Sequence, residues 1–183
     1  MSQQLKSKSK FLSLVLRHKP DEIDLQLDPE GWADVDELIR LAGVKGVSLT
    51  HELVREIVAT NDKKRFALDG SGNRIRANQG HSVPVDLRLI AVEPPPTLFH
   101  GTATRFVSSI RELGLVSGSR QHVHLSAKSA TATEVGSRHG KPVVLVVQAI
   151  EMHQAGHAFY ISDNGVWLTD SVPCHYIEFP PEV

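Results

Sequence analysis

The sequence has little of what marks secreted or membrane proteins. It contains a single cysteine, Cys174, which excludes an intramolecular disulfide and favours a reducing compartment. No apolar run approaches the roughly 18 residues of a membrane span, and the longest, Pro142 to Val147, predicts a buried strand. The first ten residues are rich in Lys, Ser and Gln and lack the apolar segment of a secretory signal. We therefore expect a cytoplasmic protein without a membrane segment.

Several motifs of nucleotide-binding and catalytic proteins are also missing. Neither Gly-x-Gly-x-x-Gly nor the P-loop pattern occurs, which argues against the nucleotide sites that they build. The absence of Gly-x-Ser-x-Gly argues against a serine hydrolase of that type. His122 and His124, with His100 or His139 as a third ligand, leave a zinc site open as an alternative. No cysteine pair or Glu-x-x-His pattern supports it, and we expect no metal.

The net charge of −1 gives no sign of a nucleic-acid partner, but the basic residues are clustered. Two segments, 1–19 and 63–76, are rich in Lys and Arg, and Asp69 is the only acidic residue in either. Two such clusters in one half of the chain predict a phosphate-binding face, and an ordinary solvated surface is the alternative. The basic residues are Lys6, Lys8, Lys10, Arg17, Lys19, Lys63, Lys64, Arg65, Arg74 and Arg76.

The first half of the chain predicts helices followed by a hairpin. An apolar stripe over residues 11–16 indicates a helix that Pro20 ends, which places Arg17 and His18 in its last turn. Alternation at residues 25–27 predicts a short strand. Asp34 and Thr50 can cap two further helices, and two short segments, 65–68 and 74–77, flank a Gly-Ser-Gly turn as a hairpin. This order is typical of a winged helix.

The prolines of the segment 83–96 mark a connector, because four of its residues are proline. Beyond it we expect short strands and helices. The predicted strands are 98–99, 123–126, 143–148, 159–161, 166–169 and 176–179, and the predicted helices are 103–113 and 127–139. The fold class is therefore α+β, with a lobe at 1–82, a proline-rich linker at 83–96 and a second lobe at 97–183.

The polar end of the hairpin indicates a binding cleft. The chain leaves the second strand through Asn78-Gln79-Gly80-His81-Ser82. Buried amide and imidazole groups need partners, so such a sequence fits a cleft wall better than a core. A hairpin exit that runs into a solvated linker is the alternative.

Two segments of the second half suggest a polar ligand site. His100-Gly101-Thr102 lies between a predicted strand and a predicted helix. In the strand at 122–126, His122, His124 and Ser126 share one face, opposite Val123 and Leu125. Such a strand has one polar and one buried face, as expected for the wall of a cleft.

Together these segments resemble one known family in their order along nearly the whole chain. The segments that carry the resemblance are Leu16-Arg17-His18-Lys19-Pro20, Leu27-Asp28 with Gly31-Trp32, Asn61-Asp62-Lys63-Lys64-Arg65-Phe66, Ile75-Arg76-Ala77-Asn78-Gln79-Gly80-His81-Ser82, His100-Gly101-Thr102, Arg120 to Ser126 and Val166-Trp167-Leu168-Thr169. The chain resembles the NAD-dependent RNA 2'-phosphotransferases (KptA type). The joint occurrence of Ala77 to Ser82 and the strand 122–126 is the most specific part.

The resemblance implies an N-terminal winged-helix RNA lobe, a C-terminal lobe similar to ADP-ribosyltransferases, and a reaction in two steps. An internal RNA 2'-phosphate, of the type left at a tRNA splice junction, attacks C1'' of the nicotinamide ribose of NAD, and nicotinamide leaves. The ribose O2'' then attacks the phosphate, which releases RNA with a 2'-OH and ADP-ribose 1'',2''-cyclic phosphate. NAD is consumed as a co-substrate, no metal is required, and we expect a monomer.

The resemblance also assigns roles to residues. It places the catalytic set on Arg17, His18, Arg65 and Arg120, and NAD contacts on His100, Gly101, Thr102, His124 and Ser126. The three arginines would hold the 2'-phosphate, and Arg17, His18 and Arg65 would stabilise the second-step transition state. The residues expected to contact RNA or its phosphates are Lys19, Arg76, Asn78, Gln79, His81, Ser82 and Arg138.

Two other functions compete with this interpretation. An ADP-ribosyltransferase that modifies terminal phosphates of nucleic acids could use the same NAD lobe and arginines without the second step. A winged-helix binding module that senses NAD without chemistry would not need His18. The strand 166–169 contains no glutamate, which argues against ordinary protein ADP-ribosylation.

Overall fold

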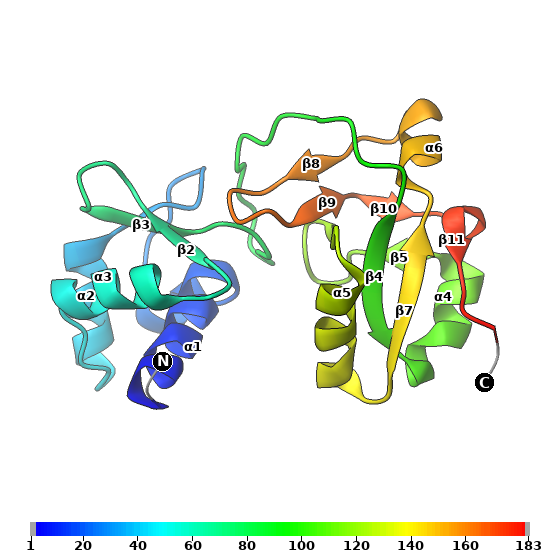
Figure 1. Cartoon of the computed structure of the whole chain (residues 1–183). Helices are drawn as coiled ribbons and strands as arrows, with labels where there is room; N and C mark the ends of the chain where they lie inside the picture. The colour runs from blue at the N-terminus through cyan, green and yellow to red at the C-terminus, as the bar shows by residue number, and fades with distance from the viewer. Residues whose placement is uncertain (1–2, 182–183) are drawn as a thin grey trace. The chain divides into compact units, whose positions relative to one another are not determined.

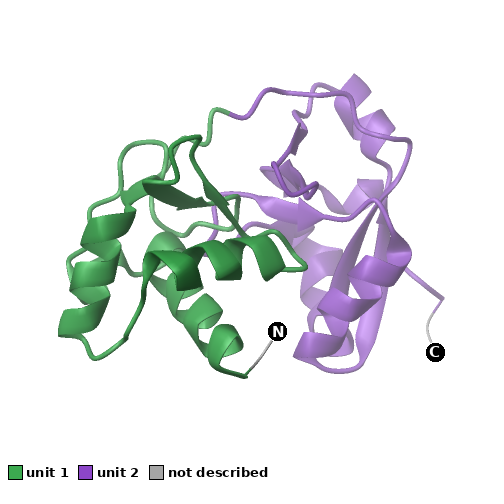
Figure 2. Cartoon of the chain, turned by 60° about the vertical axis from the view of Figure 1, so that its left-hand side comes forward, with its two compact units in different colours: residues 1–88 green, residues 89–183 purple. Residues whose placement is uncertain are grey.

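A computed structural model describes residues 3–181 and divides the chain into two compact units, Met1–Arg88 and Leu89–Val183 (Figure 2). The described residues form six α-helices and several small antiparallel sheets, which is the mixed α+β class expected from the sequence. None of the helices formed by residues 3–181 is long and apolar enough to cross a membrane. The two units are described separately below.

Three helices of unit 1 begin and end where local signals require (Figure 1). Helix α1 (Gln3–Arg17) precedes a 3-10 turn, η1 (Pro20–Ile23). The Asp34 side chain accepts a hydrogen bond from Glu37 N at the start of α2 (Val35–Val44). Thr50 accepts one from Leu53 N at the start of α3 (His51–Thr60). Both caps agree with the sequence prediction.

A small sheet completes unit 1. Its strand order is β1–β3–β2, and β1 (Ala33–Asp34) and β2 (Phe66–Leu68) both pair antiparallel with β3 (Arg74–Ala77). The predicted hairpin is thereby confirmed, with Phe66 opposite Ala77. One core cluster joins the helices to the sheet, and Leu12, Leu16, Leu38 and Ile75 are fully buried in it.

The strand expected at residues 25–27 is wrong. Residues 25–28 form no regular secondary structure, and Leu25 is buried in the core of unit 1. Asp24 adopts a left-handed conformation directly before this segment, and Leu25 N donates to the carbonyl of Pro20. The alternation of apolar and polar residues therefore reflects burial against the core, because no neighbouring strand pairs with this segment.

The connecting segment contains no helix or strand from residue 83 to residue 97 apart from an isolated bridge between Ala91 and Tyr160. Its first part is tied to unit 1, since Asp86 N donates to the carbonyl of Pro29. Its second part is tied to unit 2, since Val92 N donates to the carbonyl of Phe159. The division between Arg88 and Leu89 falls between these two attachments.

Unit 2 contains two three-stranded antiparallel sheets and one strand pair. The first sheet has the order β11–β7–β4, and the second has the order β6–β9–β8. Phe99 and Ser126 exchange two backbone hydrogen bonds of 2.8 Å, which link the edges of the two sheets. The bounds are β4 (Leu98–Ala103), β5 (Leu115–Val116), β6 (Val123–Leu125), β7 (Pro142–Val147), β8 (Tyr160–Ile161), β9 (Trp167–Thr169), β10 (Ser171–Val172) and β11 (Ile177–Glu178).

The helices of unit 2 are short. They are α4 (Val107–Leu113), α5 (Ser129–Gly136) and α6 (Ala149–Gln154), with 3-10 turns η2 (Thr104–Phe106), η3 (Ser137–His139) and η4 (Cys174–Tyr176). The predicted helix at 103–113 begins later, because Ala103 is the last residue of β4. The prediction also lacked α6 and the β5–β10 pair, which are too short to produce a periodic pattern.

Helix α5 packs unusually close to β4 (Figure 1). A Cβ atom on Gly101 would lie 1.8 Å from the backbone oxygen of Ala132, and one on Gly136 would lie 2.5 Å from the backbone oxygen of Thr102. Both distances are shorter than any real contact, so the approach of this helix to this strand requires glycine on both sides. This packing fixes the strand that carries His100 and Thr102.

Candidate active site

The end of α1 presents Arg17 and His18 differently. His18 N and Lys19 N both donate to the carbonyl of Leu14, at 3.0 and 2.9 Å, and Pro20 follows. Arg17 is 9% exposed, while His18 is exposed. The Arg17 Nη2 donates to the carbonyl of Arg65 at 3.4 Å, and its guanidinium lies 6.0 Å from the centre of the Phe66 ring. Burial against the hairpin thus fixes the Arg17 guanidinium, whereas the His18 imidazole stays accessible.

The polar segment after the hairpin returns to the end of α1. Ser82 N donates to the carbonyl of Arg17 at 2.8 Å, and the Ser82 hydroxyl can donate to the same carbonyl at 3.4 Å. The Nδ1 of His18 lies 2.9 Å from Ser82 Oγ. With the hydroxyl proton directed to the Arg17 carbonyl, His18 Nδ1–H donates to Ser82 Oγ. This arrangement orients the imidazole, and it joins residues 64 positions apart.

Arg65, the residue directly before β2, is also held close to the end of α1. Asn78 N donates to the carbonyl of Arg65 at 2.9 Å, and Asn78 Nδ2 donates to the carbonyl of Lys64 at 2.7 Å. Asn78 is 6% exposed, so it acts on the backbone of the hairpin from inside the unit. We call Arg17, His18, Arg65, Asn78 and Ser82 the unit 1 cluster.

His81 lies behind this cluster and is held neutral. It is 1% exposed, and neither ring nitrogen has a hydrogen-bond partner within residues 3–181. Burial lowers its pKa to about 4, helped by the charges of Arg17, His18 and Arg76. Above pH 5 it therefore adds no positive charge to the cluster.

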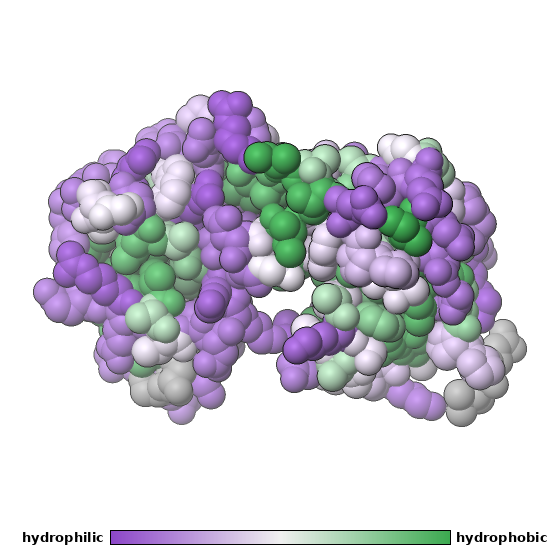
Figure 3. Space-filling view, turned by 45° about the horizontal axis from the view of Figure 1, so that its top comes forward, coloured by the Kyte–Doolittle hydropathy of each residue, from purple (hydrophilic) through white to green (hydrophobic). Residues whose placement is uncertain are grey.

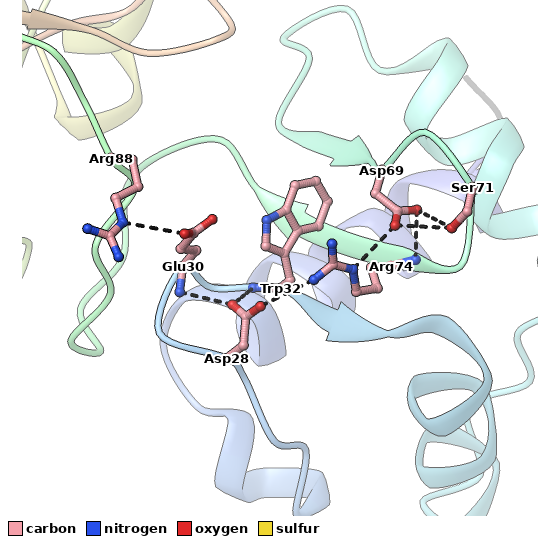
Figure 4. A network of polar contacts seen from close by, with 7 residues as sticks. All are labelled: Asp28, Glu30, Trp32, Asp69, Ser71, Arg74 and Arg88. Carbon is pink, nitrogen blue, oxygen red and sulfur yellow. Dashed lines mark hydrogen bonds and ion pairs between the residues drawn. The ribbon is translucent and has the colours of Figure 1, made fainter.

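Arg74 and Arg76 both lie over the indole of Trp32. Figure 4 shows Arg74 beside Trp32 and bonded to the carboxylate of Asp69. The guanidinium carbons lie 5.4 Å and 4.6 Å from the centre of the indole. Arg74 also pairs with Asp69 at 3.3 Å and Asp28 at 3.5 Å. Although burial opposes the change, hydrogen bonds from Arg74, Ser71 and Asn73 lower the pKa of Asp69 to about 2. Arg74 is thus committed to holding the hairpin.

The remaining predicted contacts of unit 1 surround the cluster. Lys19 is exposed, and its ammonium lies 4.0 Å from the carboxylate of Glu22. Gln79 is half-buried between Asn78 and Gly80. Gly80 has a φ of 87°, which allows the chain to turn at this point.

In unit 2, alternate residues of β4 face opposite sides. Gly101 faces α5, as its contact with Ala132 shows, whereas His100 and Thr102 line a pocket of about 220 Å³. A contact between Gly101 and a ligand would therefore be restricted to its backbone. The other lining residues are Phe106, Ser109, Ile110, Leu113, Gly114, Leu115 and Val116.

The pocket wall is apolar where it meets the surface. Phe106, Leu113 and Val116 are among the large apolar side chains that stay exposed. Figure 3 shows one face of the molecule, on which apolar patches interrupt a mostly hydrophilic surface. Phe106, Ile110 and Leu113 recur at helical spacing along η2 and α4, and this spacing is the sequence signal that our prediction of the site did not use.

The His100 ring is fixed by β6. Its Nδ1 lies 3.1 Å from the carbonyl of His124 and donates to it, which leaves Nε2 as the acceptor of a neutral ring. Burial lowers the pKa of His100, the hydrogen bond to His124 opposes this, and His139 adds to the lowering. The imidazole therefore serves unit 2 as a neutral hydrogen-bonding group.

Strand β6 has the two faces that the sequence predicted. Val123 and Leu125 are buried, while His122, His124 and Ser126 are half-buried on the other side. His122 lies 3.9 Å from Asp170 and makes an edge contact with Tyr160 at 5.8 Å. Burial lowers the pKa of His122, and Asp170 opposes this change.

The two arginines predicted for unit 2 are exposed. Arg120 precedes β6 in a turn in which its N–H donates to the carbonyl of Ser117 at 3.2 Å. Arg138 lies in η3. Each unit thus holds one part of the predicted set: Arg17, His18 and Arg65 in unit 1, and Arg120 with the predicted NAD residues in unit 2.

Within residues 3–181, the structure contains no group of three or more His, Cys, Asp or Glu side chains arranged to share a metal ion. The zinc alternative of the sequence analysis therefore gains no support, and the expectation that the reaction needs no metal stays a prediction.

Comparison with known proteins defines the class. Residues 3–171 match the family described as RNA 2'-phosphotransferase, Tpt1 / KptA family. The chain belongs to this family, whose members use NAD as a co-substrate, and it is accordingly a transferase that acts on RNA 2'-phosphates.

Individual relatives carry the same description over almost their whole length. The chain is 60% identical over 178 residues to the probable RNA 2'-phosphotransferase of Rhodopirellula baltica, covering 97% of each chain. It is 58% identical over 177 residues to the protein of the same name from Hahella chejuensis, covering 97% of this chain and 95% of the relative. For Acaryochloris marina the identity is 56% over 176 residues, with 96% and 97% covered.

Proposed function

We propose that this transferase removes an internal 2'-phosphate from RNA, of the tRNA splice-junction type, in two steps that consume NAD. In the first step an oxygen of the 2'-phosphate attacks C1'' of the nicotinamide ribose, the C1''–N bond breaks, and nicotinamide leaves with the bond electrons. In the second, the ribose O2'' attacks phosphorus. The bond from phosphorus to the RNA O2' breaks, and O2' takes a proton to become a hydroxyl. The cyclic product is ADP-ribose 1'',2''-cyclic phosphate.

The observation that carries this proposal is the unit 1 cluster. A phosphate monoester has a second pKa near 6, so the nucleophile of the first step is already an anion at pH 7 and needs no general base. It needs aligned positive charge, which a guanidinium supplies. Arg17 is locked by burial and by its bond to the Arg65 carbonyl, and His18 is oriented by Ser82.

His18 suits proton transfer in the second step. Imidazole is the side chain whose unperturbed pKa lies nearest to neutrality, which makes histidine the commonest general acid or base. When Nδ1 donates to Ser82 Oγ, Nε2 is the nitrogen that exchanges a proton with the reacting groups. His18 would accept a proton from the attacking O2'' or deliver one to the departing O2' of the RNA. Arg17 and Arg65 would stabilise the charge on the phosphorane.

We assign unit 1 as a winged-helix RNA lobe. Its order, α1–β1–α2–α3–β2–β3 with a three-stranded antiparallel sheet, supports this assignment. Two of the expected RNA contacts, Asn78 and Ser82, belong to the cluster. The others, Lys19, Arg76, Gln79 and His81, lie close to its members in the sequence. The burial of Asn78 and His81 favours indirect roles for these two residues, in which they shape the surface that RNA meets.

We assign unit 2 as the NAD lobe, similar to ADP-ribosyltransferases. The pocket supports this, since largely apolar walls beside His100 and Thr102 suit a purine ring next to a ribose. The His100 Nε2 would accept a hydrogen bond from a ribose hydroxyl. The backbone of Gly101, together with His124 and Ser126 on the polar face of β6, would complete the NAD contacts, with His124 against nicotinamide. Arg120 and Arg138 would contact phosphate.

The test is an incubation of the protein with NAD and a short RNA that carries one internal 2'-phosphate, with separation of the products. We expect RNA with a 2'-OH, nicotinamide and ADP-ribose 1'',2''-cyclic phosphate in equal amounts. ADP-ribosylated RNA that never resolves would instead indicate an enzyme that modifies nucleic-acid phosphates. NAD that stays intact would indicate a binding module. A parallel reaction with EDTA tests the prediction that no metal is needed.

A further inference from the structure

A buried amide, Asn61, joins α1, α3 and the hairpin of unit 1. Asn61 ends helix α3 and is 4% exposed. Its Nδ2 donates to the hydroxyl oxygen of Ser9 in the middle of α1, at 3.2 Å. Its Oδ1 accepts from Lys63 N at 3.2 Å and from the Arg65 Nη1 at 3.4 Å. A single side chain therefore touches the helix, the turn and the guanidinium.

This set of partners fixes the orientation of the amide. Two N–H donors face Oδ1, and both can only donate, so the oxygen must lie on that side. The nitrogen then faces the Ser9 hydroxyl, which can accept. A buried amide with both ends satisfied has one stable orientation, because reversing it would leave polar groups without partners.

The turn that Asn61 holds is strained. Lys64 has a φ of 42°, in the left-handed region that side chains other than glycine and asparagine disfavour. Lys64 N donates to the carbonyl of Asn61 at 2.8 Å, and the Lys64 carbonyl accepts from Asn78 Nδ2 at 2.7 Å. Such a conformation persists only where its surroundings determine it from several sides, and it is frequent at ligand-binding sites. Arg65 is the residue that directly follows the strained Lys64.

Arg65 is thereby held at both ends. Its backbone carbonyl accepts hydrogen bonds from Asn78 N and from Arg17 Nη2, and its guanidinium donates to Asn61 Oδ1. The amide orients the guanidinium without bringing a charge of its own. Arg74 shows the contrast, since its guanidinium pairs with the carboxylates of Asp69 and Asp28.

We propose that Asn61 is a positioning residue for Arg65: through Oδ1 it holds the strained turn and the guanidinium in the orientation that the second chemical step requires. The proposal rests on the proposed role of Arg65 in that step. Asn61 is buried and bonds to Ser9, Lys63 and Arg65, so we expect its loss to reach the chemistry through the position of Arg65.

The experiment follows both steps in single-turnover reactions with NAD and RNA that carries one 2'-phosphate. We expect Asn61→Ala to slow the disappearance of the 2'-phospho-ADP-ribosylated RNA about tenfold, as loss of a positioning contact does, while its formation changes less than threefold. Combining Asn61→Ala with Arg65→Ala should be no slower than Arg65→Ala alone, because the two changes remove one function. Thr60→Ala is the matched control, since the hydroxyl of this exposed neighbour donates to the carbonyl of Glu56.

Asn61→Asp separates positioning from folding. It keeps an acceptor for the Arg65 guanidinium and fits the same space, but it brings the negative charge that the amide avoids. We therefore expect it to restore part of the second-step rate, to a value between those of Asn61→Ala and the native protein. Melting curves show whether each variant folds. Equal slowing of both steps in folded Asn61→Ala, additive effects in the double variant, or failure of a folded Asn61→Asp to rescue would each overturn the proposal. If Arg65→Ala itself did not accumulate the intermediate, the proposed role of Arg65 in the second step would be wrong.

Discussion

The two units solve different recognition problems with different kinds of side chain. Unit 1 brings cations together and fixes them, since Arg17 is 9% exposed and both it and Asn61 bond to Arg65. Unit 2 instead holds His100 and His122 with lowered pKa values and pairs His100 with an apolar pocket. The first arrangement suits a phosphate dianion, whereas the second suits a flat, hydrogen-bonding ligand. Buried, bonded cations thus characterise the unit 1 cluster, whereas imidazoles with lowered pKa values characterise the candidate residues of unit 2.

The largest expected effect concerns the reactive imidazole of unit 1. We expect His18→Ala to slow the second step by about 10² to 10⁴, the range for loss of a general acid or base, and to accumulate ADP-ribosylated RNA. Quenched time courses with separated RNA species measure this. The matched control is His51→Ala, an imidazole of α3 that bonds to Asp36. Slowing of the first step by the same factor would contradict the assignment of His18 to the second step, because His18 would then serve both steps.

The second prediction concerns the packing that supports the unit 2 pocket. In Gly101→Ala the new methyl would lie 1.8 Å from the backbone oxygen of Ala132, so α5 must shift. We expect the free energy of unfolding to fall by about 1–3 kcal/mol, as it does when a core is overpacked. We also expect NAD binding to weaken. Denaturant titration and calorimetry measure the two effects.

Gly43→Ala is the control for this prediction. It lies in α2 of unit 1 with no atom within 4 Å of its Cβ position. We expect it to raise the stability by about 0.5–1 kcal/mol, since alanine favours helix more than glycine does. Equal effects of the two substitutions on the free energy of unfolding would show that the close approach of α5 to β4 is not needed for stability.

The third prediction concerns the neutral imidazole behind the unit 1 cluster. The folded pKa of His81, about 4, lies below the value near 6.5 of an unfolded chain. The unfolded state therefore binds a proton first as the pH falls, and the stability that His81 contributes above pH 6.5 declines until about pH 4. The total loss is of the order of 3 kcal/mol. We expect His81→Gln to lessen the decline of unfolding free energy between pH 7 and pH 4.

Much of unit 1 was predictable because its signals are local. Asp34 and Thr50 cap the helices that their sequences indicate, and the Gly-Ser-Gly turn gives the hairpin. The strand expected at residues 25–27 failed because alternation reports burial, whereas a strand also needs a partner. In unit 2 the two faces of β6 followed from alternation, but α6 and the β5–β10 pair gave no periodic signal.

The sequence named candidate members of the site but could not show how they are connected. The resemblance named Arg17, His18 and Arg65, and the sequence marked the polar segment 78–82. The bond between His18 and Ser82 joins residues 64 positions apart, and the contacts of Asn61 reach from Ser9 to Arg65. Such contacts depend on the packed core, which no local pattern encodes. The apolar wall of the pocket was missed because Phe106, Ile110 and Leu113 have the spacing of an ordinary core helix.

The most direct test compares an arginine of each unit on the isolated intermediate. Purified 2'-phospho-ADP-ribosylated RNA is given to the Arg65→Ala and Arg120→Ala proteins, with Arg74→Met as the control for loss of an arginine outside the cluster. The rate at which ADP-ribose 1'',2''-cyclic phosphate forms is measured. In the proposed mechanism unit 1 supplies the charge for the second step, so we predict that Arg120→Ala resolves the intermediate at least about tenfold faster than Arg65→Ala does. Equal rates for these two proteins would contradict the assignment of the second step to unit 1.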